Sequence, residues 1–348
     1  MKDMIELNYS ISLKKSPNSG IEVLKTILTF LIIVFHSYRL NSPDNKIINY
    51  LIEIAPFYFP TYFLIFFYFS YNVFSTRKIG YIKHRFVKLI VPYICWPIIF
   101  RFINIISTNK PLELENVLRD IFIQLTLGRH IYFVFWSQFN MIIISLIFGI
   151  ILFSTKKYKN LIFLIMFITS YIFEYFGFRE YLFEGYNDDI KRSVGRIPKM
   201  MIYSITGMFL SSTKFLSIIK KNKWKSIIVS FCGYCSILFI KIYFYINYYY
   251  FEGILLDLGA IFLLILFAMI PLDELTNMKM IVLIKQMTSY TSGVYYLHIK
   301  IYRYFKDSIL ILRNGSLIGC VLNYFICYCI CFVGMKLFGK TKLKYLFI

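Results

Sequence analysis

The stretch GIEVLKTILTFLIIVFHSY, residues 20–38, decides the fold class of this 348-residue chain. Its apolar centre contains one weakly polar residue, Thr29, and the run is long enough to cross a bilayer as a helix. Eleven residues at about 100° each return a helix to within roughly 20° of its starting direction, so Lys25 and His36 share one face. They are roughly 16 Å apart along the axis, at about 1.5 Å per residue. Ionisable side chains inside a membrane span are costly, and both residues are therefore candidates for function.

The composition extends this expectation to the whole chain. Hydrophobic residues make up 58% of it and aromatic residues 20%, and its mean hydropathy is +0.63. Apolar segments recur along the full length, which predicts an all-α polytopic membrane protein with a single transmembrane domain over residues 1–348. We expect about ten transmembrane helices, at residues 21–40, 55–75, 86–106, 132–154, 161–178, 197–213, 226–247, 254–271, 281–302 and 316–338.

The distribution of basic residues predicts the orientation. Most of the Lys and Arg residues between the spans fall in the connections that share a side with the amino terminus. By the positive-inside rule this places both termini in the cytoplasm, with an even number of spans; eight or twelve spans are the alternatives left open. The same bias, with attraction to membrane lipids, accounts for the net charge of +21, so we expect no nucleic-acid partner. All seven Cys lie in apolar segments, and we expect neither a disulfide framework nor a metal site.

Five segments of the chain carry short motifs, which follow one another in a defined order and spacing. In the first, Glu22 and Lys25 precede His36, with ten residues between Lys25 and His36; the others read FFYFSY (66–71), KHRFVKLIVPY (83–93), FWSQFN (135–140) and SGVYYLH (292–298). In this order and spacing the chain resembles the acyltransferase-3 family of integral-membrane O-acyltransferases. It departs from the family pattern at Lys25, where arginine is usual, and at Tyr71, where glycine is usual.

The resemblance implies transfer of an acetyl group from acetyl-CoA to a hydroxyl of a carbohydrate acceptor. The composition, rich in Ile, Lys, Asn and Tyr, suits a multi-pass enzyme of the bacterial inner membrane. It implies catalytic roles for His36 and His298. His36 would act as general base towards the acceptor hydroxyl, or would itself carry the acyl group; the sequence leaves both mechanisms open. His298 would orient His36 or bind the acceptor. The alternative for both histidines is hydrogen bonding between packed helices.

Three basic residues are candidates for binding the donor. Lys25, Arg85 and Lys88 all belong to the predicted cytoplasmic side, where cations would hold the phosphates of acetyl-CoA. The alternatives are that Lys25 anchors its helix end at the headgroups and that Arg85 and Lys88 reflect the positive-inside bias.

Further candidates concern the acceptor. Trp136 and Asn140, one helical turn apart, are expected to line a cavity, although Trp136 is equally an interfacial anchor. Arg196 closes a long outer connection and is expected to contact an anionic polysaccharide. Arg101 and Asp257 are charges within apolar segments that we expect to face the bundle interior. The rival interpretation of the chain is a transporter or flippase for acyl groups or glycan intermediates, without chemistry of its own. No pattern specifies an oligomeric state.

Overall fold

The computed structural model describes residues 18–41, 57–75, 79–108, 114–127, 133–154, 158–176, 178–182, 185, 194–243, 249–270, 272, 278–305 and 317–348. Within these ranges every regular element is a helix, which confirms the all-α prediction. The helices are α2 (Ser19–Asn41), α4 (Tyr58–Ser75), α5 (Ile79–Thr108), α6 (Leu114–Leu127), α7 (Phe133–Ser154), α8 (Lys159–Tyr175), α9 (Phe178–Leu182), η2 (Val194–Arg196), α11 (Ile197–Leu210), α12 (Thr213–Lys221), α13 (Lys223–Tyr243), α14 (Tyr249–Met269), α16 (Met278–Ser289), α17 (Thr291–Phe305), α19 (Leu317–Phe338) and η3 (Lys342–Leu346).

Four of the described helical segments are long and apolar enough to cross a membrane: Ser19–His36, Ile79–Ile103, Lys223–Lys241 and Leu317–Phe338. A fifth span results if α11 and α12, which meet at a bend of 62°, count as one. Ser137–Phe153 and Gly253–Met269 are shorter apolar helices. Each of the predicted spans coincides with one described helix or a pair, so the chain has the helices of a polytopic membrane protein. The total of ten spans and the cytoplasmic termini stay predictions.

The structure corrects one predicted span and adds detail to two other regions. The predicted span 281–302 is broken at Tyr290, whose amide donates to the Met287 carbonyl only three residues back and so separates α16 from α17. The connection between the predicted spans 86–106 and 132–154 contains helix α6, with Val117 buried. Helix α5 begins at Ile79, earlier than the predicted span, so Arg85 and Lys88 belong to one helix.

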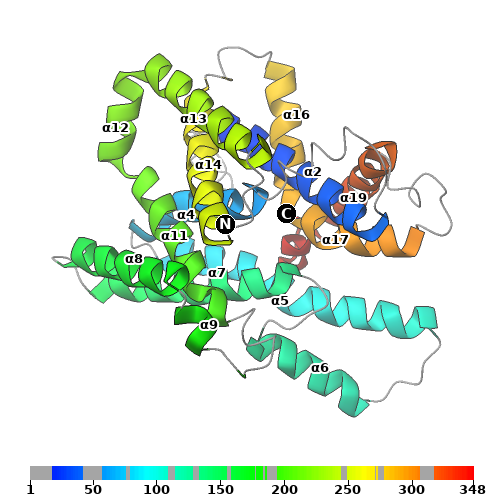
Figure 1. Ribbon diagram of the computed structural model, residues 1–348. Coiled ribbons are helices and arrows are strands. Elements are labelled where there is room, and N and C mark those ends of the chain that lie inside the picture. The colour runs from blue at the N-terminus through cyan, green and yellow to red at the C-terminus, as the bar shows by residue number, and fades with distance from the viewer. Residues whose placement is uncertain are drawn as a thin grey trace.

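Helix α2 occupies the centre of the arrangement and positions the site. It contacts α4, α14, α16, α17 and α19, which come from both halves of the chain (Figure 1). One buried apolar cluster joins α2 to α4 and α11, and a second joins α2 to α5, α17 and α19. The two faces of α2 are thus packed into two different cores, and side chains along it are presented to both.

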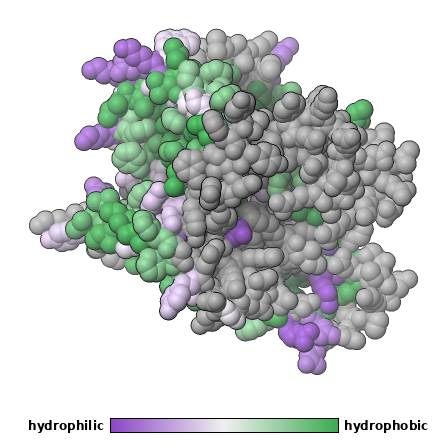
Figure 2. All heavy atoms as spheres, viewed as in Figure 1, coloured by the Kyte–Doolittle hydropathy of each residue, from purple (hydrophilic) through white to green (hydrophobic). Residues whose placement is uncertain are grey.

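Apolar side chains cover much of the outer surface. Figure 2 shows them gathered over α8 and α13, at the left of the view. Large apolar side chains that face outwards are normal for a surface in contact with lipid and unusual in a soluble protein. Those that are exposed on these two helices are Leu161, Leu164, Ile165, Ile168, Ile172, Trp224, Ile228, Val229, Phe231 and Phe239.

A glycine allows a close contact between α4 and α11. A Cβ atom added at Gly207 of α11 would lie 2.5 Å from the carbonyl oxygen of Leu64 on α4, and small residues let membrane helices approach this closely. We expect Gly207→Val to force the helices apart and to lower the thermal midpoint of the detergent-solubilised protein, since overpacking costs about 1–3 kcal/mol. Gly149→Val on α7 is the matched control, because nothing lies within 4 Å of an added Cβ there. Equal midpoints for the two variants would contradict this account of the α4–α11 contact.

Candidate active site

Two histidines from opposite ends of the chain lie next to each other. His36 lies on α2 and His298 on α17, and their ring centroids are 5.2 Å apart with planes inclined at 41°. His298 is only 1% exposed and packs on the ring of Tyr295 at 5.9 Å, whereas His36 is half-buried. The structure therefore brings together the two residues for which catalytic roles were predicted.

A backbone contact indicates which nitrogen of His298 carries its proton. The Nδ1 atom lies 3.3 Å from the carbonyl oxygen of Val294, one turn earlier in α17. Because a carbonyl oxygen only accepts hydrogen bonds, this contact requires the proton on Nδ1 and leaves a lone pair on Nε2. Among the described residues, Nε2 has no hydrogen-bond partner. A buried imidazole with a lone pair can accept a hydrogen bond from a second imidazole or from a hydroxyl, which suits an orienting role.

Three cations line a cavity of about 590 Å³, which we call the cation-lined cavity. Lys25 reaches it from α2, and Arg85 and Lys88 reach it from α5. Within the described part of the chain, no Asp or Glu lines this cavity. Three positive charges around a partly dehydrated cavity attract anions strongly, because the local dielectric is far below that of water. The three residues predicted to bind the donor thus face one common space.

The side chain of Arg85 is held in place by helix α4. Its Nε atom donates to the Ser70 hydroxyl at 3.1 Å, and an Nη atom donates to the Phe66 carbonyl oxygen at 3.1 Å. The guanidinium also lies 4.1 Å from the centroid of the Phe66 ring, within cation–π distance. The motif at residues 66–71 therefore has a mechanical role, which is to fix the orientation of an arginine on the neighbouring helix.

Tyrosines connect the cation-lined cavity to the histidine pair. Tyr295 lines the cavity and stacks on His298, which lies one turn later in α17. Tyr295 also stacks on Tyr62 of α4, with ring centroids 5.9 Å apart. Tyr62 also lines the cavity and donates to the backbone oxygen of Lys25 at 3.2 Å. A second hydrogen bond joins the hydroxyls of Tyr62 and Thr29. The histidines do not themselves line the cavity; they lie behind Tyr295.

The predicted acceptor residues are placed differently. Asn140 is fully buried, and neither atom of its amide has a hydrogen-bond partner among the described residues; its neighbours Ser137 and Gln138 line the cavity, but Asn140 does not. Gln138 is fixed by a hydrogen bond from its Nε2 to the Leu89 carbonyl oxygen, at 2.5 Å. Arg196 precedes α11 and lines neither this cavity nor the smaller one beside α14. The side chain of Trp136 lies outside what the structure describes.

Some residues of the site have no counterpart in the predicted set. Tyr62 lies in a predicted apolar span, where a single tyrosine gives no sequence signal, whereas Gln138 belongs to the quoted motif at residues 135–140. Ser70 and Tyr295 stand inside quoted motifs, so the signal was there. Their roles depend on helices that meet only after folding.

A model of the acyltransferase domain family matches residues 18–338, from the start of α2 to the end of α19. With the apolar helices described above, the match defines the class as a membrane acyltransferase. The chain belongs to the acyltransferase-3 family, as its five sequence motifs predict. No curated protein and no solved structure matches it.

Proposed function

We propose that this protein transfers an acetyl group from acetyl-CoA to a hydroxyl group of a surface polysaccharide or lipid-linked glycan at the bacterial inner membrane. One observation carries the proposal: the cation-lined cavity and the histidine pair share Tyr295, which lines the first and stacks on the second. The acetyl end of a donor bound at the cations would therefore have to pass Tyr295 to reach the imidazoles.

The cations suit the phosphate groups of acetyl-CoA. Arg85 presents a planar set of donors that Ser70 and Phe66 hold in place, while Lys25 and Lys88 act as point charges from two helices. Lys25 and His36 are eleven residues apart on one helix, roughly 16 Å along the axis at about 1.5 Å per residue. An extended pantetheine arm spans a separation of this order. The phosphates would thus lie at the predicted cytoplasmic end and the thioester near the histidines.

The chemistry at His36 has two balanced forms. As a general base, the imidazole accepts the proton of the acceptor hydroxyl while the oxygen attacks the thioester carbonyl; the C–S bond breaks and the proton passes to the departing thiolate. As an acyl carrier, an imidazole nitrogen attacks the thioester first and releases CoA, and the hydroxyl then takes the acetyl group from nitrogen. In either form His298, with its Nε2 lone pair, is suited to position His36.

The test is ester formation by the purified protein in lipid nanodiscs. Labelled acetyl-CoA is supplied together with envelope glycans extracted from cells that lack the chain, and the glycans are analysed by mass spectrometry for new acetyl esters. The proposal expects label in ester linkage on the glycan and release of free CoA. A transporter or flippase would leave both substrates unmodified, and that result would overturn the proposal.

Replacing Lys25 separates its two interpretations. If the positive charge at the cavity matters, Lys25→Arg keeps most of the transfer activity, whereas Lys25→Ala weakens acetyl-CoA binding about tenfold or more, since a hydrogen bond to a charged group contributes about 1.5–3 kcal/mol. The measurement is the KM for acetyl-CoA at constant acceptor. Equal KM values for Lys25→Ala and the unmodified protein would assign Lys25 to anchoring of the helix end.

A further inference from the structure

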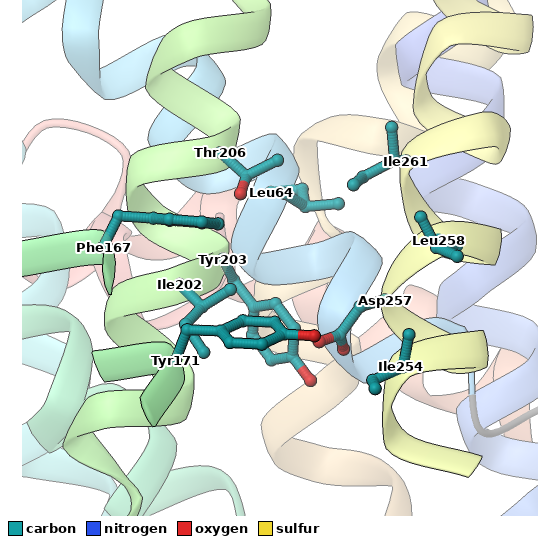
Figure 3. Close-up of a pocket in the computed structure, with 10 residues that line it drawn as sticks. All are labelled: Leu64, Phe167, Tyr171, Ile202, Tyr203, Thr206, Ile254, Asp257, Leu258 and Ile261. Carbon is teal, nitrogen blue, oxygen red and sulfur yellow. The ribbon is translucent and has the colours of Figure 1, made fainter. Parts of the chain in front are cut away.

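A second cavity, of about 140 Å³, lies on the other side of helix α4 from the cation-lined cavity. Leu64 faces the small cavity, whereas its neighbours Phe63 and Ile65 face the large one. Consecutive residues of a helix point about 100° apart, so α4 forms a wall between the two spaces. The remaining walls come from α8, α11 and α14 (Figure 3).

One carboxylate projects into this small cavity. Asp257 of α14 accepts a hydrogen bond at Oδ2 from the hydroxyl of Tyr175. Its other oxygen, Oδ1, is shielded from solvent and accepts no hydrogen bond of good geometry from the described residues, although the Tyr203 hydroxyl lies close to the carboxylate. Figure 3 shows the carboxylate directed across the cavity, towards the hydroxyl groups of Tyr171 and Tyr203. An acceptor oxygen that lacks a partner in a shielded position is costly unless a ligand or water supplies the missing donor.

An ion pair and a glycine lie close to Asp257 and fix the helices around it. Lys199 of α11 forms an ion pair with Glu174 at the end of α8, with Nζ and Oε1 3.9 Å apart. A Cβ atom added at Gly253, one turn before Asp257, would lie 3.6 Å from that Nζ and 3.2 Å from the Tyr175 ring, so the glycine lets α14 approach both neighbours. The ends of three helices are thereby locked around the carboxylate.

Aromatic rings form the wall opposite Asp257. Phe167, Tyr171 and Tyr175 follow one another at four-residue intervals on α8, with centroid distances of 6.3 Å and 4.7 Å. Phe167 and Tyr171 line the cavity, as does Tyr203 from α11. A pocket with mostly apolar and aromatic walls and a few fixed polar groups is typical of a small-ligand site. A sugar ring matches it, because its C–H faces pack on aromatic rings while its hydroxyls need acceptors.

We propose that this small cavity binds one sugar ring of the glycan acceptor, with Asp257 Oδ1 accepting a hydrogen bond from a ring hydroxyl. The identification of the ligand as the acceptor rests on the proposed function. The location agrees with it: Glu174 ends α8 and Lys199 begins α11, on either side of the connection that the charge pattern assigns to the outer face. Since one water occupies about 10–15 Å³ on this measure, the space suits a single ring better than an extended chain.

A cation is the competing ligand for this cavity. Lys199 places one ammonium group beside two carboxylates, those of Glu174 and Asp257, so the cluster keeps a net negative charge. An ammonium group and a neutral hydroxyl both donate to a carboxylate oxygen, and the aromatic walls of the cavity suit a sugar ring. A positively charged ligand is therefore the outcome that the test has to exclude.

The experiment measures sugar binding independently of acyl transfer. Methyl glycosides of neutral hexoses and N-acetylhexosamines are added to the protein in nanodiscs, and saturation-transfer NMR reports which of them bind. We expect a signal from at least one glycoside with the unmodified protein. We expect binding about tenfold weaker with Asp257→Asn, because hydrogen bonds to a charged acceptor are roughly twice as strong as neutral ones. Thr206→Phe, which fills the cavity without touching the carboxylate, should abolish the signal.

A crossed control separates this proposal from the proposed function. Asp257→Asn and Thr206→Phe should keep the acetyl-CoA affinity and thermal midpoint of the unmodified protein, which shows that they fold. Lys25→Ala should lose acetyl-CoA affinity and keep the glycoside signal. No glycoside signal with the unmodified protein, an equal signal with all variants, or a signal from ethanolamine alone would overturn the sugar site, even where acetyl-CoA binds. If the unmodified protein does not bind acetyl-CoA but gives the glycoside signal, the proposed function is contradicted and the sugar site is supported.

Discussion

His36→Ala is expected to lower acetyl transfer by ~10²–10⁴-fold while the affinity for acetyl-CoA stays within twofold of the unmodified protein, because the variant removes a general base or acyl carrier. The ring lies against His298, 5.2 Å between centroids, and does not line the cation-lined cavity. Catalysis and donor binding should therefore separate. Transfer is measured as labelled ester on extracted glycan, and affinity by calorimetry in nanodiscs.

The matched control for this variant is His84→Ala. His84 is exposed near the start of α5 and lines neither cavity, so its loss should leave the rate of transfer unchanged. Unchanged transfer by His36→Ala would remove His36 from the reaction. The two mechanisms are distinguished by incubating the protein with labelled acetyl-CoA and no acceptor, then quenching rapidly. Only an acyl carrier leaves label on the unmodified protein and none on His36→Ala.

Arg85→Ala should raise the dissociation constant of acetyl-CoA by about 10–100-fold, since hydrogen bonds to charged groups contribute about 1.5–3 kcal/mol. The effect should be larger than a lost charge alone would give, because Ser70 and Phe66 orient the guanidinium towards the cavity. Arg85→Lys should restore affinity only in part, since an ammonium group cannot bond both partners from a planar fork.

The control for Arg85 is a second basic residue of the same helix. Lys83 is exposed and does not line the cation-lined cavity, so Lys83→Ala removes the same charge two residues away and should leave the dissociation constant unchanged. Calorimetry with acetyl-CoA provides the measurement for all three variants. Equal weakening by Arg85→Ala and Lys83→Ala would mean that the predicted cytoplasmic face binds the donor by net charge alone.

The fold was largely predictable because hydropathy is a local property. Each long apolar run proved to be helical. The family was predicted from motifs whose order is visible in the sequence, and the family match confirms it. The failures also have local causes. The run 281–302 is apolar enough to be continuous, yet a three-residue hydrogen bond at Tyr290 divides it. No span is predicted between residues 106 and 132, yet helix α6 forms there and one of its faces buries Val117.

The candidate site was predictable only in part. Lys25 and His36 share a helix, so their common face followed from geometry alone, and Arg85 and Lys88 followed from one turn of α5. The pairing of His36 with His298 was expected only from the family resemblance, since 261 intervening residues by themselves give no indication of which helices meet. Asp257 stands out in the sequence as a charge in an apolar span. Its cavity is formed by four helices, and no sequence motif marks the residues that line it.

The amino-acid sequence alone determined that the chain is a helical membrane protein of this family. It also identified the functional candidates, because ionisable side chains inside apolar spans are costly in lipid and are retained for a reason. Both conclusions rest on residue type and short-range periodicity, which the chain carries before it folds. Only the tertiary structure decided that three cations face one cavity, that Tyr295 joins this cavity to two histidines, and that a carboxylate lies beyond α4 in a second cavity. These arrangements arise from helix packing, in which close contacts such as that of Gly207 with Leu64 select the partners, and local patterns do not encode them.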